Sequence, residues 1–314
     1  MFQLKVGTFE GLIATDFDAY EESKWASNRF NLERMRAREH AQSLAHTALP
    51  SEMLGRLQLV MDASQDHPTI FNHHRVDSQW VFATRKTEER KRIASLIESE
   101  HSLAERFEDL ALHQLHAVLG LRLNVAGLDL LTTIHRGAAI DRRNLAARLG
   151  SDEGHAEFLT ILHALPESTE CILGDTSQVA AEVTVDDIAA WIEALKGADW
   201  IALRRHFPRD DERLAAPEFA LAAAETLSAF SAFHAFAAWT DDNDQIEVNK
   251  QLKEAREARR QAAGDLEIGG EVRVIAGLLS GRKGIVMEVD GKGSARVRLG
   301  TMSMMLPVES IQRL

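Results

Sequence analysis

The sequence predicts a multi-domain α+β protein with an N-terminal mixed α/β layer, a helical middle region and a small C-terminal β-barrel. Three observations lead to this fold class. The chain has 314 residues, 45% apolar and 27% charged, which suffices for two or three packed domains. Strand-like and helix-like apolar patterns alternate along its first half, and after Gly264 the apolar period becomes two. One cysteine and 6 prolines exclude a disulfide scaffold and a collagen-like chain.

Residues 1–177 are expected to form an α+β domain with a mostly antiparallel sheet. The segment Thr15–Asp18 resembles a capping box that opens a long helix, and Pro50 ends that helix. Two apolar runs flank Asn124–Gly127, which predicts a β-hairpin, and Asp141 is expected to cap the next helix. The expected strands are 4–9, 57–62, 78–83, 116–123, 128–135 and 169–173, and the expected helices are 16–49, 87–98, 141–149 and 152–165.

Residues 178–240 are expected to form a helical region packed on this domain. A second capping box, Thr184–Asp187, opens a helix that Gly197 closes, and residues 198–207 are interpreted as a further helical piece. The segment 217–239 is rich in alanine and places phenylalanines near one face, as a buried core helix does.

Charge is distributed unevenly along the chain. The formal net charge is −12, from 36 Lys and Arg against 48 Asp and Glu, whereas residues 250–314 alone carry +4. Binding of nucleic acid depends on neutralised phosphates, so an acidic chain can contact it only locally. Residues 241–264 are expected to form a charged helical linker, and the basic end of the chain is the expected interaction region.

Residues 265–314 are expected to form the small barrel, because four or five short strands fit within fifty residues. The expected strands are 271–275, 282–289, 294–299, 302–306 and 308–311. The segment Asp290–Gly293 carries the Asp-Gly signal of a tight hairpin.

This segment resembles the KOW motif of NusG-like transcription factors and of some large-subunit ribosomal proteins. The matching features are Val272–Val274, the turn from Gly277 to Gly281, the basic pair before Gly284 and the apolar alternation up to Leu299. The resemblance implies an SH3-like barrel in which Gly277, Gly281 and Gly284 are structural. It also implies a partner from transcription or translation, namely RNA or a protein associated with the ribosome or RNA polymerase.

The candidate partner-binding residues are basic side chains on and around these strands. Phosphate contacts suit them, whereas no aromatic residue interleaves with them as a stacking platform. They are Arg273, Arg282, Lys283, Lys292, Arg296 and Arg298.

The N-terminal part resembles the uncharacterised YktB-type bacterial family. The similarity rests on Phe9–Leu12 leading into Asp16–Phe17, and on Trp80–Phe82. It implies a TBP-like α+β fold and no known chemistry.

A metal site is the weaker alternative chemistry. Imidazoles and carboxylates that can bind zinc or iron gather within a dozen residues, at His67, His73, His74 and Asp77. Established metal-ligand spacings are absent, so polar loop histidines are the simpler interpretation. Cys171 lies in an apolar run with no nearby base, and no catalytic residue or cofactor is predicted.

We therefore expect a cytoplasmic, non-enzymatic adaptor that does not bind membranes. It would bind RNA or the transcription or translation machinery through its barrel. Two alternatives stay open. One is an enzyme, metal-dependent or not, that acts on a nucleic acid or a small molecule and uses the barrel for targeting. The other is a barrel that serves only contacts within the protein or its oligomer. Nothing in the sequence determines the oligomeric state.

Overall fold

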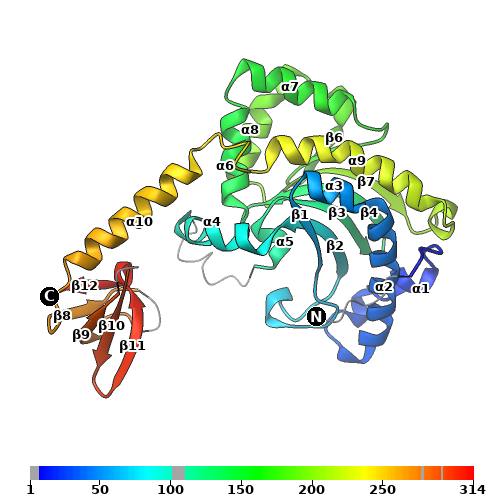
Figure 1. Cartoon of the computed structure of the whole chain (residues 1–314). Helices are drawn as coiled ribbons and strands as arrows, with labels where there is room; N and C mark the ends of the chain where they lie inside the picture. The colour runs from blue at the N-terminus through cyan, green and yellow to red at the C-terminus, as the bar shows by residue number, and fades with distance from the viewer. Residues whose placement is uncertain (1–6, 101–109, 277–278, 291–292) are drawn as a thin grey trace. The chain divides into compact units, whose positions relative to one another are not determined.

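The computed structural model describes residues 7–100, 110–276, 279–290 and 293–314, and it is an α+β protein (Figure 1). The chain divides into two compact units, the N-terminal unit (Met1–Ile246) and the C-terminal unit (Glu247–Leu314). Each unit is built around one antiparallel sheet, of seven and five strands respectively. The α+β class predicted from the sequence is confirmed.

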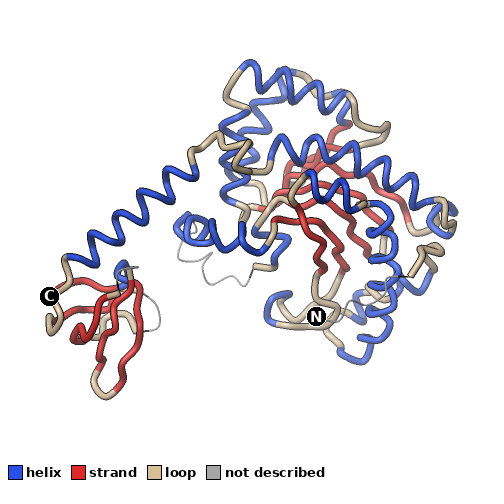
Figure 2. Tube along the Cα trace, in the orientation of Figure 1, coloured by secondary structure: helices blue, strands red, loops and turns tan. Residues whose placement is uncertain are grey.

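The N-terminal unit is organised by its seven-stranded sheet, in the order β1-β2-β3-β4-β7-β5-β6 (Figure 2). Every pairing described between these strands is antiparallel. The predicted hairpin is confirmed, since β3 and β4 pair directly around a two-residue loop. The strands are β1 (Leu59–Ala63), β2 (Ser78–Arg85), β3 (Val118–Asn124), β4 (Gly127–His135), β5 (Glu170–Leu173), β6 (Thr176–Val179) and β7 (Trp200–Pro208).

Helices α2 and α9 pack against each other and against the central strands. They cover one face of the sheet because strand side chains alternate, so that one set of apolar residues from each strand points toward them. The helices are α1 (Ala14–Asp18), α2 (Asn31–Ala48), α3 (Ser51–Arg56), α4 (Thr87–Glu100), α5 (Leu112–Leu115), α6 (Ala139–Arg148), α7 (Asp152–His163), α8 (Ile188–Gly197) and α9 (Phe219–Ala237).

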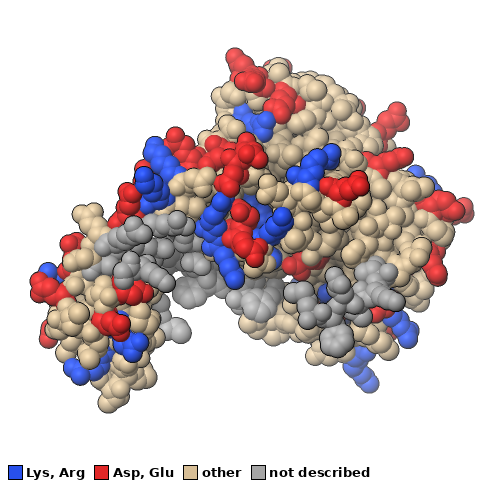
Figure 3. All heavy atoms as spheres, viewed as in Figure 1, with Lys and Arg blue, Asp and Glu red and all other residues tan. Residues whose placement is uncertain are grey.

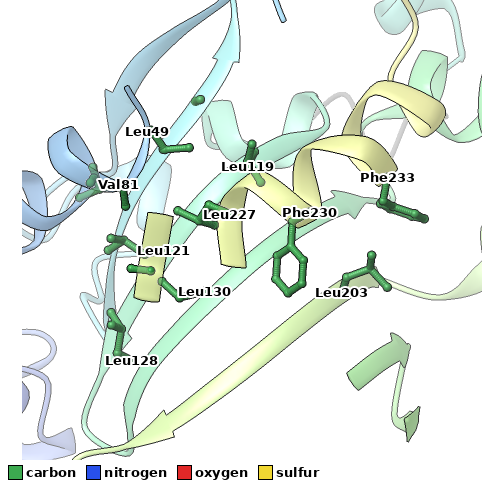
Figure 4. Packing of buried hydrophobic residues seen from close by; sticks show 14 of the residues in the cluster. Leu49, Val81, Leu119, Leu121, Leu128, Leu130, Leu203, Leu227, Phe230 and Phe233 are labelled. Carbon is green, nitrogen blue, oxygen red and sulfur yellow. The ribbon is translucent and has the colours of Figure 1, made fainter. Parts of the chain in front are cut away.

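The main core lies between α9 and the sheet. Figure 4 shows Leu227 and Phe230 of α9 beside leucines of β3 and β4. Among the described residues α9 is the one helix long and apolar enough to cross a membrane, and just over half of that stretch is buried inside the protein. Its phenylalanines belong to this core, as the sequence predicted.

The helical interpretation of residues 198–207 is wrong, because these residues form β7 in the middle of the sheet. All nine residues of β7 pair with β4. Ile201, Leu203 and Phe207 point into the core, and Arg205 on the same face donates a hydrogen bond to Thr226 of α9, whereas the even-numbered residues between them face the other way. This period of two is the strand signal, and long-range pairing with β4 outweighs local helix propensity.

The long helix predicted for residues 16–49 is also wrong in its first half. Residues 19–30 make turns between α1 and α2. The buried guanidinium of Arg34 donates hydrogen bonds to the carbonyl oxygens of Lys24 and Ser27, which satisfies backbone groups that a helix would have paired internally. Residues 4–6 of the strand predicted for residues 4–9 lie outside the described residues, and residues 7–9 form no strand.

Asp141 does not cap α6, which begins two residues earlier. Its buried carboxylate instead binds the guanidinium of Arg85 through both oxygens. The same carboxylate accepts hydrogen bonds from the backbone amides of Ala117 and Trp239, each at 2.8 Å. Arg85 also donates to the carbonyl oxygen of Trp239 at 2.7 Å. The network joins β2, the start of β3, α6 and the segment after α9.

The C-terminal unit begins with the predicted charged helix, α10 (Val248–Gly264), which contacts the turn Val308–Ser310 of the same unit. Its sheet has the order β11-β10-β9-β8-β12, and no hydrogen-bonded pairing between β11 and β12 closes it among the described residues. The strands are β8 (Glu271–Val274), β9 (Lys283–Val289), β10 (Ser294–Leu299), β11 (Met302–Pro307) and β12 (Ile311–Arg313).

We expect Asp141→Asn to destabilise the N-terminal unit by about 3–5 kcal/mol, because it leaves the buried Arg85 guanidinium without a countercharge. Urea unfolding of the full chain measures this change. Asp175→Asn in the exposed β5–β6 turn is the control and should change stability by less than about 0.5 kcal/mol. Equal effects of the two substitutions would contradict the assigned role of Asp141.

Candidate functional site

Side chains alternate between the two faces of the C-terminal sheet, and this alternation determines on which face each predicted basic residue lies. Val272, Val274 and Val297 point into the small core, so Arg273, Arg296 and Arg298 point outward and are exposed. Five predicted site residues lie in the described part of this unit, and Lys292 lies outside the described residues.

Cross-strand register brings the outward cations together. Arg273 on β8 lies directly opposite Lys283 on β9, and Arg298 on β10 lies opposite Ile285, two residues along β9. Like charges in directly opposed positions destabilise a sheet. We call this set, Arg273, Lys283, Arg296 and Arg298, the basic face.

The basic face is incompletely neutralised. Arg296 pairs with Glu288 at 3.5 Å. Within the part of the chain that the structure describes, neither Arg273, Lys283 nor Arg298 has a carboxylate within ion-pair distance. Two carboxylates, Glu271 and Glu288, share this face with its four cations, and exposed Arg282 adds a fifth cation in the adjoining turn. The result is a local excess of positive charge on an acidic protein.

Basic and acidic side chains are otherwise interspersed on the surface seen in Figure 3. Ion pairs between neighbouring side chains account for much of this mixture, such as Arg148 with Glu157 at 2.7 Å and Arg209 with Asp18 at 2.7 Å. The basic face differs from these pairs because Arg273 and Lys283 lie directly opposite each other rather than opposite a carboxylate.

Gly284 lies where the surrounding side chains leave no room for a Cβ. It lies opposite Val272 on the inner side of the sheet. A Cβ at this position would lie 2.5 Å from a methyl of Val297, 2.6 Å from a methyl of Leu299 and 2.8 Å from the carbonyl oxygen of Arg298. Gly281 has a φ of +86°, which favours glycine, and Gly277 lies outside the described residues.

The histidines of the metal hypothesis do not form a ligand set. The described residues contain no group of three or more His, Cys, Asp or Glu side chains that could hold a metal ion. His67 is hydrogen-bonded to neighbouring Asp66 at 2.8 Å, and Asp77 accepts a hydrogen bond from Ser78. His73 and His74 are both exposed and adopt positive φ values of 52° and 56°.

The structure adds a site that the sequence analysis missed, on the sheet face opposite α2 and α9. A pocket of about 490 Å³ opens there, and we call it the sheet-face pocket. It is lined by Ser64, Gln65, Asn72, His73, Arg75, Val76, Asp77, Ser78, Trp80, Ala111, His113, Gln114, Arg122 and Trp200. Nine of these residues lie between Ser64 and Trp80, among them His73 and Asp77 of the metal hypothesis, and the others come from segments far along the chain.

Three roughly parallel rings form one side of this pocket. The ring centroids of Trp80 and His113 lie 4.6 Å apart, and those of Trp80 and Trp200 lie 5.5 Å apart. Trp80 is on β2 and Trp200 is on β7, with two strands between them. Strands are spaced about 4.8 Å apart, so the two indoles can meet only if the sheet coils and this face is concave. Gly120 permits the coil, because a Cβ there would collide with the carbonyl oxygen of Val81.

A row of polar side chains crosses the same concave face. Trp80, Arg122, Asp129 and His206 are direct cross-strand neighbours on four successive strands. Arg122 and His206 each hydrogen-bond to the buried carboxylate of Asp129, at 2.7 Å. Burial by itself would raise the pKa of Asp129, but these two partners outweigh it and hold the pKa below its usual value. The guanidinium of Arg122 also lies 5.5 Å from the ring centroid of Trp80.

His113 in the pocket and His135, whose ring contacts Trp200, are neutral at physiological pH. Burial lowers the pKa of His113 to about 3, with smaller contributions from His135 and Arg122. Burial likewise lowers the pKa of His135 to about 4. The Nδ1 atom of His135 accepts a hydrogen bond from the amide of Gly137, so its proton is on Nε2. The Nδ1 atom of His113 is buried and has no hydrogen-bond partner in the described chain.

No protein-family model matches the sequence, and no curated protein matches it. The resemblances to the KOW motif and to the YktB-type family therefore remain interpretations.

We expect Gly284→Val to destabilise the C-terminal sheet by roughly 1–3 kcal/mol, because the new side chain must displace Val297 and Leu299. Hydrogen exchange of residues 271–299 in the full chain measures this loss. Gly264→Ala is the control, since nothing lies within 4 Å of a Cβ there. Unchanged exchange in Gly284→Val would contradict the packing role.

Acid should destabilise the N-terminal unit through His113. Its pKa is about 3 when folded and about 6.5 when unfolded, so the unfolded chain binds one more proton between these values. Stability is thus complete above about pH 6.5 and falls by roughly 1.4 kcal/mol per pH unit below it for this group. We expect His113→Phe to flatten the pH dependence of urea unfolding by that amount. Exposed His46→Gln should leave it unchanged.

Proposed function

We propose that the protein is a non-enzymatic adaptor that binds RNA through the basic face of its C-terminal unit. The observation that carries the proposal is the directly opposed pair Arg273 and Lys283, with Arg298 beside it. Their mutual repulsion costs stability in the free protein, and a polyanion laid across the strands relieves it. Phosphate oxygens are the usual acceptors for such side chains.

The chemistry of the basic face favours the RNA backbone over its bases. Residues 265–314 contain no Phe, Trp or Tyr on which a base can stack. Contacts made by Arg and Lys to phosphate position a protein on nucleic acid but carry no sequence information. Binding should therefore be strongly salt-dependent and weakly sequence-dependent.

The strand order supports the KOW interpretation of this unit. Four strands follow one another as a meander, and the last strand, β12, returns beside the first, β8. A sheet of this order can curl toward a small barrel of the SH3-like type, as the resemblance implies. The acidic remainder of the chain repels phosphate, which confines RNA to the C-terminal unit.

A protein partner is the second candidate, and edge strand β11 favours it. Its residues Met302, Met304 and Met305 are exposed by 37–54%. Methionine-rich surfaces adapt to different partners, and an unpaired strand edge offers backbone groups for pairing. Such a complex would survive nuclease treatment, whereas the RNA complex would not.

We expect the full chain to bind a labelled RNA oligonucleotide with an affinity that falls roughly 20- to 40-fold between about 50 and 200 mM salt if three phosphates are neutralised. Lys283→Gln should reduce the slope of log affinity against log salt by about 0.7–0.9, the share of one phosphate contact. Fluorescence anisotropy measures both quantities.

Lys250→Gln is the matched control, because it removes the same charge from an exposed lysine of the same unit that is paired with Glu247. It should leave the slope unchanged. Salt-independent binding, or equal slopes for the two variants, would overturn RNA binding by the basic face. Cellular partners that survive nuclease and are lost with Met305→Glu would establish the protein-binding alternative.

A further inference from the structure

We propose that the sheet-face pocket binds a mononucleotide. The base is a planar nitrogen heterocycle, and the phosphate is the anionic group attached to it. This inference goes beyond the proposed function, since the pocket lies wholly in the N-terminal unit and shares no residue with the basic face. Its volume of about 490 Å³ lies within the range of small-molecule sites.

The aromatic side of the pocket selects a flat ring. Trp80 and Trp200 are stacked with an interplanar angle of 16°, and His113 lies at 11° to Trp200, so the three rings present a common orientation. Aromatic faces stack on nucleobases whatever their sequence. The guanidinium of Arg122 packs against the ring of Trp80 and is paired with Asp129. These contacts hold the aromatic side of the pocket in position.

A buried, unpartnered hydrogen-bonding atom points to a ligand with polar edges. His113 is only 9% exposed, and its Nδ1 has no partner among the described residues. A neutral imidazole has one donor and one acceptor nitrogen, which suits the mixed donors and acceptors at the edge of a base. An apolar ring would leave this nitrogen unsatisfied.

Arg75 supplies the position for the anionic group. Its guanidinium stacks on Trp25, 4.5 Å from the ring centroid, and it lines the pocket. Unlike Arg122, it has no carboxylate within ion-pair distance in the described part of the chain. A stacked guanidinium with free N–H groups is suited to bind phosphate. Asp77 lines the pocket too, and its carboxylate can accept a hydrogen bond from an exocyclic amino group.

The test titrates the full chain with AMP, GMP, CMP and UMP and with the four matching nucleosides. Calorimetry gives the affinities, and quenching of tryptophan fluorescence reports contact with the rings. We expect at least one mononucleotide to bind, and to bind more tightly than its nucleoside. The absence of binding by all eight compounds at millimolar concentration would overturn the proposal.

Two variants separate the ring from the anionic group. Trp200→Leu should lower the affinity for every nucleotide that binds by about 5- to 150-fold, which is the range expected for the loss of one stacking ring. Trp200→Phe should retain most of the original affinity. Arg75→Gln should lower the affinity for the mononucleotide to that of its nucleoside. Arg29→Gln, at an exposed arginine outside the pocket lining, is the matched control and should change neither.

Unchanged affinity in both Trp200→Leu and Arg75→Gln would show that the nucleotide binds elsewhere and would overturn the assignment. Equal affinities of a nucleotide and its nucleoside for the unsubstituted protein would overturn the role of Arg75. Lys283→Gln should leave mononucleotide affinity unchanged, so failure of the proposed RNA binding and failure of this proposal are distinguishable.

Discussion

The carboxylate of Asp141 is the point on which the architecture of the N-terminal unit depends. Removing two charges from water raises the free energy of the folded state. This ion pair is tolerated because four N–H donors from three other segments form hydrogen bonds to the carboxylate oxygens. Each donor must be in place for the pair to be stable. The end of β2, the start of β3, α6 and the segment after α9 are therefore held in one arrangement, which seats α9 on its face of the sheet.

Seating α9 on one face leaves the other face available for a site. One row across that face consists of Trp80, Arg122, Asp129 and His206, and it adjoins a small apolar cluster of Phe82, Val118 and Leu131. Gly120 allows neighbouring strands to approach closely, and the sheet coils until the indoles of β2 and β7 meet. The sheet-face pocket thus results from the coiling of the sheet and from the lack of a side chain at Gly120. His113 and His135 stay neutral because burial disfavours their charged forms.

The C-terminal unit carries its charges on an exposed surface, whereas the Arg85–Asp141 pair of the N-terminal unit is buried. Its sheet is small, so its outward residues are almost all solvated, and charge rather than burial distinguishes them. Arg273 lies opposite Lys283, and the repulsion between these like charges lowers the stability of the free sheet. The surrounding chain is acidic, so the repulsion is concentrated on one surface. The two proposed sites therefore differ in kind: one recognises a ring in a concavity, and the other recognises charge along a surface.

The sequence by itself determined what depends on neighbouring residues. Alternation predicted the β3–β4 hairpin and the strands β8 to β11 of the C-terminal unit, because these features depend on a period of two and on local turns, whereas the strand expected at 308–311 is a turn followed by β12. Only the tertiary structure decided that Trp200–Pro208 is a strand, that Asp141 binds Arg85 rather than capping a helix, and that Trp80, His113 and Trp200 meet. Those outcomes depend on residues dozens of positions apart. Hydrogen-bond pairing and burial between such residues outweigh local propensity, and no local pattern records them.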